Sequence, residues 1–215
     1  MWRDFPQTLA GYTDRRVLAY SRFGHGESDP PAMPHTVRFM HDEARLLPEV
    51  LDEAGIDRAI LLGHSDGGSI ALIAAAESPL RVAALVLEAP HVFVEDGSLT
   101  SIVRMKRHWD TTNLRDRLAR YHRDVDVAFH GWNDVWLDPA FRNWNLEAFL
   151  PRVSCPALLI QGELDEYGTL KQIDAIERQL AGPTTRLILK ETGHSPHRDR
   201  PQDVVQAIAA LIAEL

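Results

Sequence analysis

The chain has 215 residues, of which 45% are hydrophobic and 25% charged, and its formal net charge at pH 7 is −8. This size and composition predict a soluble globular protein with one domain and a substantial core. The acidic balance argues against nucleic acid and an anionic membrane surface as partners, and no apolar run approaches the roughly 20 residues that span a bilayer. The N-terminal residues lack the apolar segment of a signal peptide, and the single cysteine, Cys155, cannot form an internal disulfide. We therefore expect a cytoplasmic protein.

Short apolar runs alternate with longer segments of helical periodicity. The predicted strands are apolar runs without alternation, as in strands buried on both faces of a parallel sheet, and cover residues 16–20, 59–62, 83–87, 157–161 and 185–189. The predicted helices carry apolar side chains three and four residues apart and cover residues 37–54, 69–76, 170–180 and 202–215. This order predicts the α/β class, with a mostly parallel, doubly wound sheet flanked by helices.

Residues 92–152 interrupt this alternation. The segment has no convincing strand pattern, is charged and helical in character, and holds four of the five tryptophans. An insertion of this size predicts a helical cap over the carboxyl edge of the sheet, where the catalytic loops of an open parallel sheet lie. We therefore expect a core formed by residues 1–91 and 153–215, with the cap at 92–152 inserted between core strands.

The motif Gly63-His64-Ser65-Asp66-Gly67-Gly68 directly follows the predicted strand at 59–62 and precedes a predicted helix. A serine at the apex of such a turn has a strained backbone and an outward hydroxyl, and the flanking glycines allow strand and helix to approach closely. The helix N-terminus also offers N–H groups and positive dipole where negative charge would develop. The pattern predicts a nucleophile at Ser65.

A serine nucleophile needs a base, and the base needs a carboxylate that fixes its tautomer. Acidic residues follow the strand at 157–161 in Gly162-Glu163-Leu164-Asp165-Glu166. A histidine follows the strand at 185–189 in Gly193-His194-Ser195-Pro196-His197. The chain order is therefore serine, acid, histidine.

These three motifs, together with Arg22-Phe23-Gly24-His25-Gly26-Glu27-Ser28, resemble those of the α/β-hydrolase fold superfamily, over nearly the whole chain. The resemblance implies that Ser65 is the nucleophile, Asp165 the orienting acid and His194 the base. It also implies that the backbone N–H of Asp66 is one donor of the oxyanion hole.

Several alternatives stand beside these assignments. Glu163 and Glu166 lie in the same loop as Asp165, and Glu88 ends the strand at 83–87, where some relatives carry their acid. His197 is a rival to His194 as the base. Four further residues are candidates for contact with substrate: His64, His91, Trp132 and Trp136.

The chain departs from the family pattern at its start. Resembling enzymes have three strands before this point, and the third ends in a glycine-rich loop that donates a second oxyanion N–H. Residues 2–10 look like the helix that follows that loop. We therefore expect the family's first three strands and the second donor to be absent, which would leave the strands at 16–20 and 59–62 facing a vacancy in the sheet.

These observations predict a serine hydrolase that cleaves a small carboxylic ester or a related acyl compound through an acyl-enzyme on Ser65. A lactone or a carbon–carbon bond is an alternative target of the same residues. A second hypothesis is a catalytically impaired or non-catalytic binding protein that lacks the oxyanion loop. We expect a small-molecule substrate, no metal and no organic cofactor, because the triad needs none; the choice between monomer and homodimer is left open.

Overall fold

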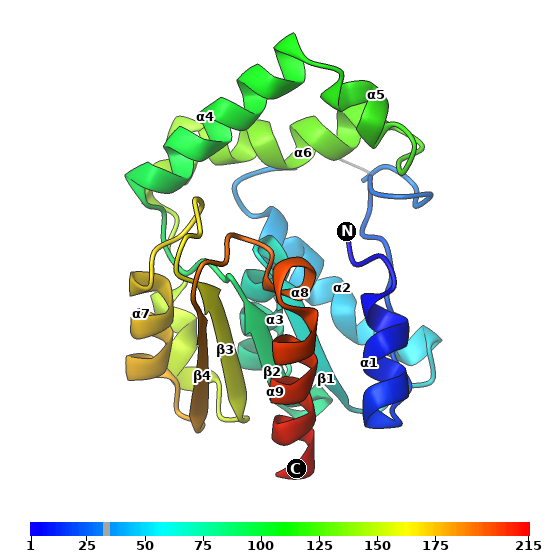
Figure 1. Cartoon of the computed structure of the whole chain (residues 1–215), viewed down its shortest axis with the longest axis vertical. Coiled ribbons are helices and arrows are strands. Elements are labelled where there is room, and N and C mark those ends of the chain that lie inside the picture. Colours follow the sequence, from blue (N-terminus) through cyan, green and yellow to red (C-terminus); the bar gives the residue numbers. More distant parts are fainter. Residues whose placement is uncertain (32–34) are drawn as a thin grey trace. The chain divides into compact units, whose positions relative to one another are not determined.

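The computed structural model describes residues 1–31 and 35–215 (Figure 1). The chain divides into two compact units. The first, here the core unit, comprises Met1–Leu18, Met40–Phe93 and Asn145–Leu215. The second, here the helical unit, comprises Ala19–Phe39 and Val94–Trp144. The sheet and the motifs at Ser65, Asp165 and His194 all belong to the core unit.

The sheet of the core unit has four strands in the order β1-β2-β3-β4, and every neighbouring pair is parallel. The strands are β1 (Ala59–His64), β2 (Val82–Glu88), β3 (Ala157–Gly162) and β4 (Thr184–Leu189). The central strands β2 and β3 are almost wholly buried, which explains their unbroken apolar sequence. The expected parallel α/β sheet is confirmed, as are its strands at 59–62, 83–87, 157–161 and 185–189.

Helices cover both faces of this sheet. On one face, α1 (Phe5–Thr13) and α9 (Pro201–Ala213) lie side by side, and their apolar side chains pack on alternate residues of β2 and β3 (Figure 1). On the other face, α3 (Asp66–Glu77) contacts β1 and β2. The short helix η3 (Glu147–Arg152) packs against α3 and α7 (Lys171–Gln179). The core unit also holds α2 (Phe39–Glu53) from its second residue on, η1 (Pro79–Arg81) and α8 (Pro196–Asp199).

The predicted strand at residues 16–20 is wrong. This segment has no sheet partner and lies outside the four strands, although Val17 packs against the apolar cluster that α1 and α9 form with the sheet. Leu18 and Tyr20 are 45% and 43% exposed, unlike residues of a central strand. An apolar run forms a strand only where a neighbouring strand supplies backbone hydrogen-bond partners. Because residues 16–20 do not pair with β1, β1 is an edge strand of the described sheet.

The helical unit contains α4 (Asp96–Thr111), α5 (Leu114–Leu118), α6 (Val125–Leu137) and η2 (Pro139–Asn143). One of its apolar clusters is formed by Trp109, Val125 and Phe129, with the Trp109 and Phe129 rings stacked at 4.0 Å between centroids. No strand lies between residues 92 and 152, although Phe93 and Asn145 of the core unit form a single antiparallel bridge.

The helical unit also takes in residues 19–31 and 35–39, because polar contacts join this segment to the chain around α6. The Gly26 N–H donates to Nδ1 of His122 at 3.1 Å, and Arg123 pairs with Asp29 at 2.8 Å. The placement of residues 92–152 as a cap over the sheet stays a prediction.

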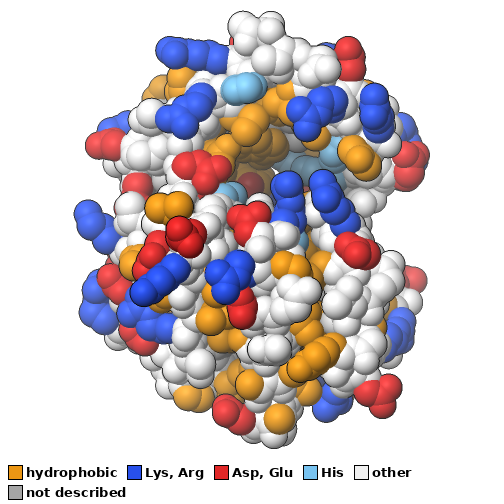
Figure 2. Space-filling model, in the orientation of Figure 1, with side chains coloured by type: hydrophobic (Ala, Val, Ile, Leu, Met, Phe, Trp, Pro, Cys, Tyr) orange, Lys and Arg blue, Asp and Glu red, His pale blue; other side chains and the backbone are white. Residues whose placement is uncertain are grey.

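The surface carries both signs of charge. Figure 2 shows Lys and Arg side chains interspersed with Asp and Glu on the face drawn, without a large field of one sign. Among the described residues, no helix combines the length and the apolar character that a bilayer crossing requires.

Candidate active site

The turn between β1 and α3 holds Ser65 in a strained conformation. Its backbone has φ 55° and ψ −123°, a region that residues other than glycine rarely adopt. A Cβ added at Gly63 would lie 2.1 Å from the carbonyl oxygen of Gly67, so only glycine allows β1 and α3 to approach this closely. The Ser65 N–H donates to the carbonyl of Glu88 at 2.9 Å, which fixes the turn to the end of β2. The predicted strand–turn–helix geometry is present.

Three side chains from separate loops form a hydrogen-bonded chain. Nε2 of His194 lies 3.0 Å from Oγ of Ser65. Nδ1 of His194 lies 2.8 and 2.9 Å from the two carboxylate oxygens of Asp165. A carboxylate only accepts, so Nδ1 carries the proton and Nε2 is left to accept the serine O–H. This is the tautomer that a general base needs.

Asp165 is enclosed by donors. Its side chain is 1% exposed, and Oδ2 accepts from Nε2 of Gln161 at 2.6 Å. Oδ1 accepts from the backbone N–H groups of Tyr167 at 2.8 Å and Gly168 at 3.3 Å. These contacts fix both carboxylate oxygens, and they hold His194 by fixing its partner.

His194, the middle member of this chain, is more accessible than Asp165. Its side chain is 14% exposed, and the Tyr167 ring lies against it with 4.6 Å between centroids. The rings of His64 and His91 lie 4.8 and 6.0 Å from it. The structure therefore brings two of the four predicted substrate-contacting residues beside the base.

His64 is held as a neutral ring. Burial lowers the pKa of His64 to about 3, and the nearby His194 adds to this effect. Its Nε2 lies 2.6 Å from the backbone carbonyl of His194. A carbonyl only accepts, so Nε2 carries the single proton of the ring. His64 is thus a hydrogen-bond donor to the loop of the base.

The rivals to Asp165 and His194 lie elsewhere. Glu163 and Glu166 are exposed. The carboxylate of Glu88 is buried, but it accepts from Nδ1 of His197 at 2.7 Å and so serves another imidazole. Asp165 is the acid that contacts His194.

The two predicted tryptophans belong to the helical unit. Trp136 is 3% exposed and packs against Phe141 and Trp144, with ring centroids 4.9 and 6.1 Å away. Trp132 is partly buried and packs on Phe129 at 5.6 Å. Both form part of the interior packing of that unit, and their contact with substrate stays a prediction.

Asp66 is the first residue of α3, where the positive end of the helix lies next to Ser65. The backbone N–H groups of a first helical turn have no acceptor within the helix itself. The position suits a donor toward charge that develops on a substrate oxygen, and this role of the Asp66 N–H stays a prediction.

Sequence reasoning did not single out Gln161 or Tyr167. Gln161 ends β3 inside an apolar run, yet it is 1% exposed and bonds both Asp165 and the carbonyl of Gly168, at 3.1 Å. A polar residue at the carboxyl end of a buried strand is the signal that could have identified it. Tyr167 offered no such signal, because its contact with His194 depends on how the loop folds.

A serine, an imidazole and a buried carboxylate joined in this order are the arrangement found in enzymes with a nucleophile–base–acid triad. The chain itself belongs to the alpha/beta hydrolase family, whose sequence profile matches residues 1–207.

Individual relatives agree with this. The chain is 29% identical to human serine hydrolase BPHL over 189 residues, which cover 84% of the chain and 64% of that protein. It is 36% identical to human monoglyceride lipase over 219 residues, covering 88% of the chain and 69% of the lipase. A thermophilic esterase from Thermogutta terrifontis superposes with a TM-score of 0.75 at 18% identity, covering 99% of the chain and 85% of the esterase, a likeness of fold alone. The chain thus spans about two thirds of the length of these curated relatives.

Proposed function

We propose that the protein is a serine hydrolase that cleaves a small carboxylic ester through an acyl-enzyme on Ser65. The observation that carries this proposal is the continuous chain from Oγ of Ser65 through His194 to Asp165, with each proton position fixed by its partner. The names of the relatives, a serine hydrolase and a lipase that acts on monoglycerides, support a hydrolytic reaction at an acyl group.

The proposed reaction has two halves. In the first, Oγ of Ser65 attacks the ester carbonyl carbon while Nε2 of His194 takes the serine proton. The tetrahedral intermediate collapses as the bond to the alcohol oxygen breaks, and His194 returns its proton to that oxygen. In the second half, His194 takes a proton from water, the resulting hydroxide attacks the acyl carbon, and Ser65 leaves with the proton.

Asp165 contributes by its fixed position. It holds Nδ1–H of His194, so the ring presents its lone pair to Ser65, and its negative charge stabilises the imidazolium that forms in both halves. The Asp66 N–H, at the N-terminus of α3, is the proposed donor to the oxyanion of the intermediate. No step requires a metal or an organic cofactor.

The bond type is the finer part of the proposal. An ester is proposed before a carbon–carbon bond because an alcohol oxygen leaves more readily than a carbon; a lactone is a cyclic ester and would react by the same steps. The test is hydrolysis of p-nitrophenyl acetate and butyrate by the 215-residue chain beside a Ser65→Ala variant. Turnover that disappears in Ser65→Ala supports the proposal, while equal turnover in both proteins rejects Ser65 as the nucleophile.

A further inference from the structure

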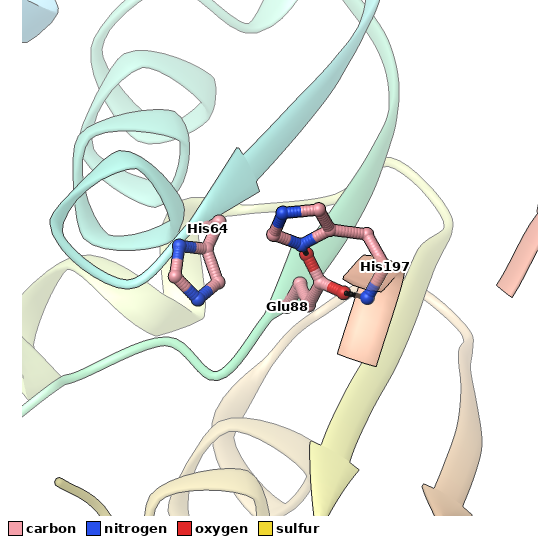
Figure 3. A group of neighbouring side chains, drawn as sticks. All are labelled: His64, Glu88 and His197. Atoms are coloured by element: carbon pink, nitrogen blue, oxygen red, sulfur yellow. Dashed lines mark hydrogen bonds and ion pairs between the residues drawn. The ribbon is translucent and has the colours of Figure 1, made fainter. Parts of the chain in front are cut away.

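A second cluster of titratable side chains lies beside the triad. It consists of His64 at the end of β1, Glu88 at the end of β2 and His197 in α8, and is called here the Glu88 cluster (Figure 3). All three residues are buried, and one potential ligand atom of each lies within 4.8 Å of the others. In Figure 3 the carboxylate of Glu88 points at the ring and backbone nitrogens of His197. The reaction proposed above moves no proton through this cluster.

Glu88 connects the nucleophile to the loop of the base. Its backbone carbonyl accepts the N–H of Ser65 at 2.9 Å. Its carboxylate accepts the backbone N–H of His197 at 2.5 Å through Oε1 and Nδ1–H of the same residue at 2.7 Å through Oε2. One residue therefore holds the turn of Ser65 on one side and the chain three residues beyond His194 on the other.

His64 makes a second connection of the same kind. It directly precedes Ser65, and its Nε2–H donates to the carbonyl of His194 at 2.6 Å. Its ring also lies 5.2 Å from the ring of His197. The loop of the base is thus fixed at residue 194 by the end of β1 and at residue 197 by the end of β2.

The same three residue types also suit a divalent metal ion. The hydrogen bonds that these three residues make favour a structural role instead of metal binding. Both oxygens of Glu88 already accept from His197, and Nε2 of His64 donates to a carbonyl. Nε2 of His197 is buried and has no hydrogen-bond partner among the described residues. A metal held by Glu88 would compete with the hydrogen bonds that its two oxygens accept from His197.

We propose that the Glu88 cluster positions the imidazole of His194, so that Glu88 and His197 are positioning residues for the serine–histidine contact. The inference rests on the proposed function. The reaction rate falls steeply when a catalytic group is misplaced, since a displacement of about 1 Å can lower the rate about 100-fold. The network fixes backbone on both sides of the 3.0 Å contact between Ser65 and His194. Loss of this network should therefore lower kcat and leave KM little changed.

Two variants of similar shape distinguish the hydrogen bond of the His197 side chain from the space that this side chain fills. His197→Asn keeps a side-chain N–H near the site of Nδ1, whereas His197→Leu has a similar branched shape and no donor. We expect His197→Leu to lose about 100-fold in kcat and His197→Asn to recover most of it. Ile173→Ala, a truncation in the core of α7 where Ile173 is fully buried, is the control for a general loss of stability. Thermal melts of all the proteins establish which of them are folded.

Proton NMR gives a readout that needs no turnover. The proton on Nδ1 of His194, shared with Asp165, is expected at low field and is assigned by its loss in Asp165→Asn. If the Glu88 cluster positions His194, this signal shifts or broadens in His197→Leu and returns in His197→Asn, while Ile173→Ala leaves it unchanged.

The outcomes separate the two proposals. Unchanged kcat and an unchanged His194 signal in folded His197→Leu would overturn the inference and leave the proposed function intact. Stoichiometric metal in the purified protein whose removal by a chelator alters the His197 resonances would also overturn it. Wild-type hydrolysis that survives Ser65→Ala would reject the proposed function, and the NMR comparison would still decide whether the cluster positions His194.

Discussion

Replacing Asp165 by asparagine tests the tautomer argument most sharply. The substitution keeps the size of the side chain but turns one oxygen into an NH₂ group. In one orientation that group faces Nε2 of Gln161, at 2.6 Å from the present Oδ2. In the other it faces the N–H groups of Tyr167 and Gly168, at 2.8 and 3.3 Å from the present Oδ1. Either orientation places donor against donor.

The amide also changes the proton on the base. An NH₂ group directed at Nδ1 of His194 favours the tautomer with its proton on Nε2, and that ring cannot accept the proton of Ser65. Loss of the correct tautomer costs about 10⁴-fold in kcat in triads of this kind, equivalent to about 5.4 kcal/mol of transition-state stabilisation. The side chain of Asp165 is only 1% exposed, so solvent does little to relieve the conflict and we expect the full effect.

The assay is steady-state hydrolysis of p-nitrophenyl butyrate by wild type, Asp165→Asn and Glu163→Gln. Glu163 lies in the same loop and is exposed, so its amide variant is the matched control and should retain wild-type kcat. A folded Asp165→Asn protein with kcat within about 10-fold of wild type would show that the hydrogen bond to Asp165 does not set the tautomer.

Three further predictions follow from the same contacts. Folding lowers the pKa of His64 from its ordinary value of 6.5 to about 3, so between pH 3 and pH 6.5 the unfolded chain binds more protons than the folded one. The free energy of unfolding therefore has its full value above pH 6.5 and falls as the pH decreases. The loss reaches about 5 kcal/mol near pH 3, and denaturant melts from pH 7 to 4 should show a shallower decline for His64→Gln, which keeps a donor without titrating. Gly63→Ala should yield little folded protein, whereas Gly67→Ala, with nothing within 4 Å of the added Cβ, should fold, as measured by soluble yield and circular dichroism. Gln161→Leu removes one donor to Asp165 and should lower kcat about 10-fold with KM unchanged; a wild-type kcat would show that this bond does not orient the acid.

The nucleophile turn could be predicted because its causes are local. Gly63 permits the close approach of β1 and α3, and the change from an apolar run to helical periodicity marks the turn around Ser65. The buried strands could also be predicted, since β2 and β3 are apolar on both faces. Their places after strands identified the loops that hold Asp165 and His194, and the resemblance to the α/β-hydrolase fold singled out these two residues; the parallel sheet brings those strand ends to one edge.

The failures depend on partners that lie far away in the chain. Residues 16–20 have the composition of a strand, but a strand also needs a neighbour, and composition does not supply one. Glu88 ends a strand just as a catalytic acid would, yet its carboxylate meets His197, which is 109 residues away, and not His194. The contacts of Gln161 and Tyr167 arise within a folded loop, where no sequence period applies.

If Ser65 forms a covalent intermediate with substrate, a reagent that traps activated serines should modify it. The folded chain would be treated with a fluorophosphonate, which reacts with an activated serine, and then analysed by intact-protein and peptide mass spectrometry. We expect one adduct per chain, on the peptide that contains Ser65, and none in Ser65→Ala or in protein denatured before treatment. Labelling that is equally fast in denatured protein, or an adduct on another residue with Ser65 unmodified, would contradict this expectation.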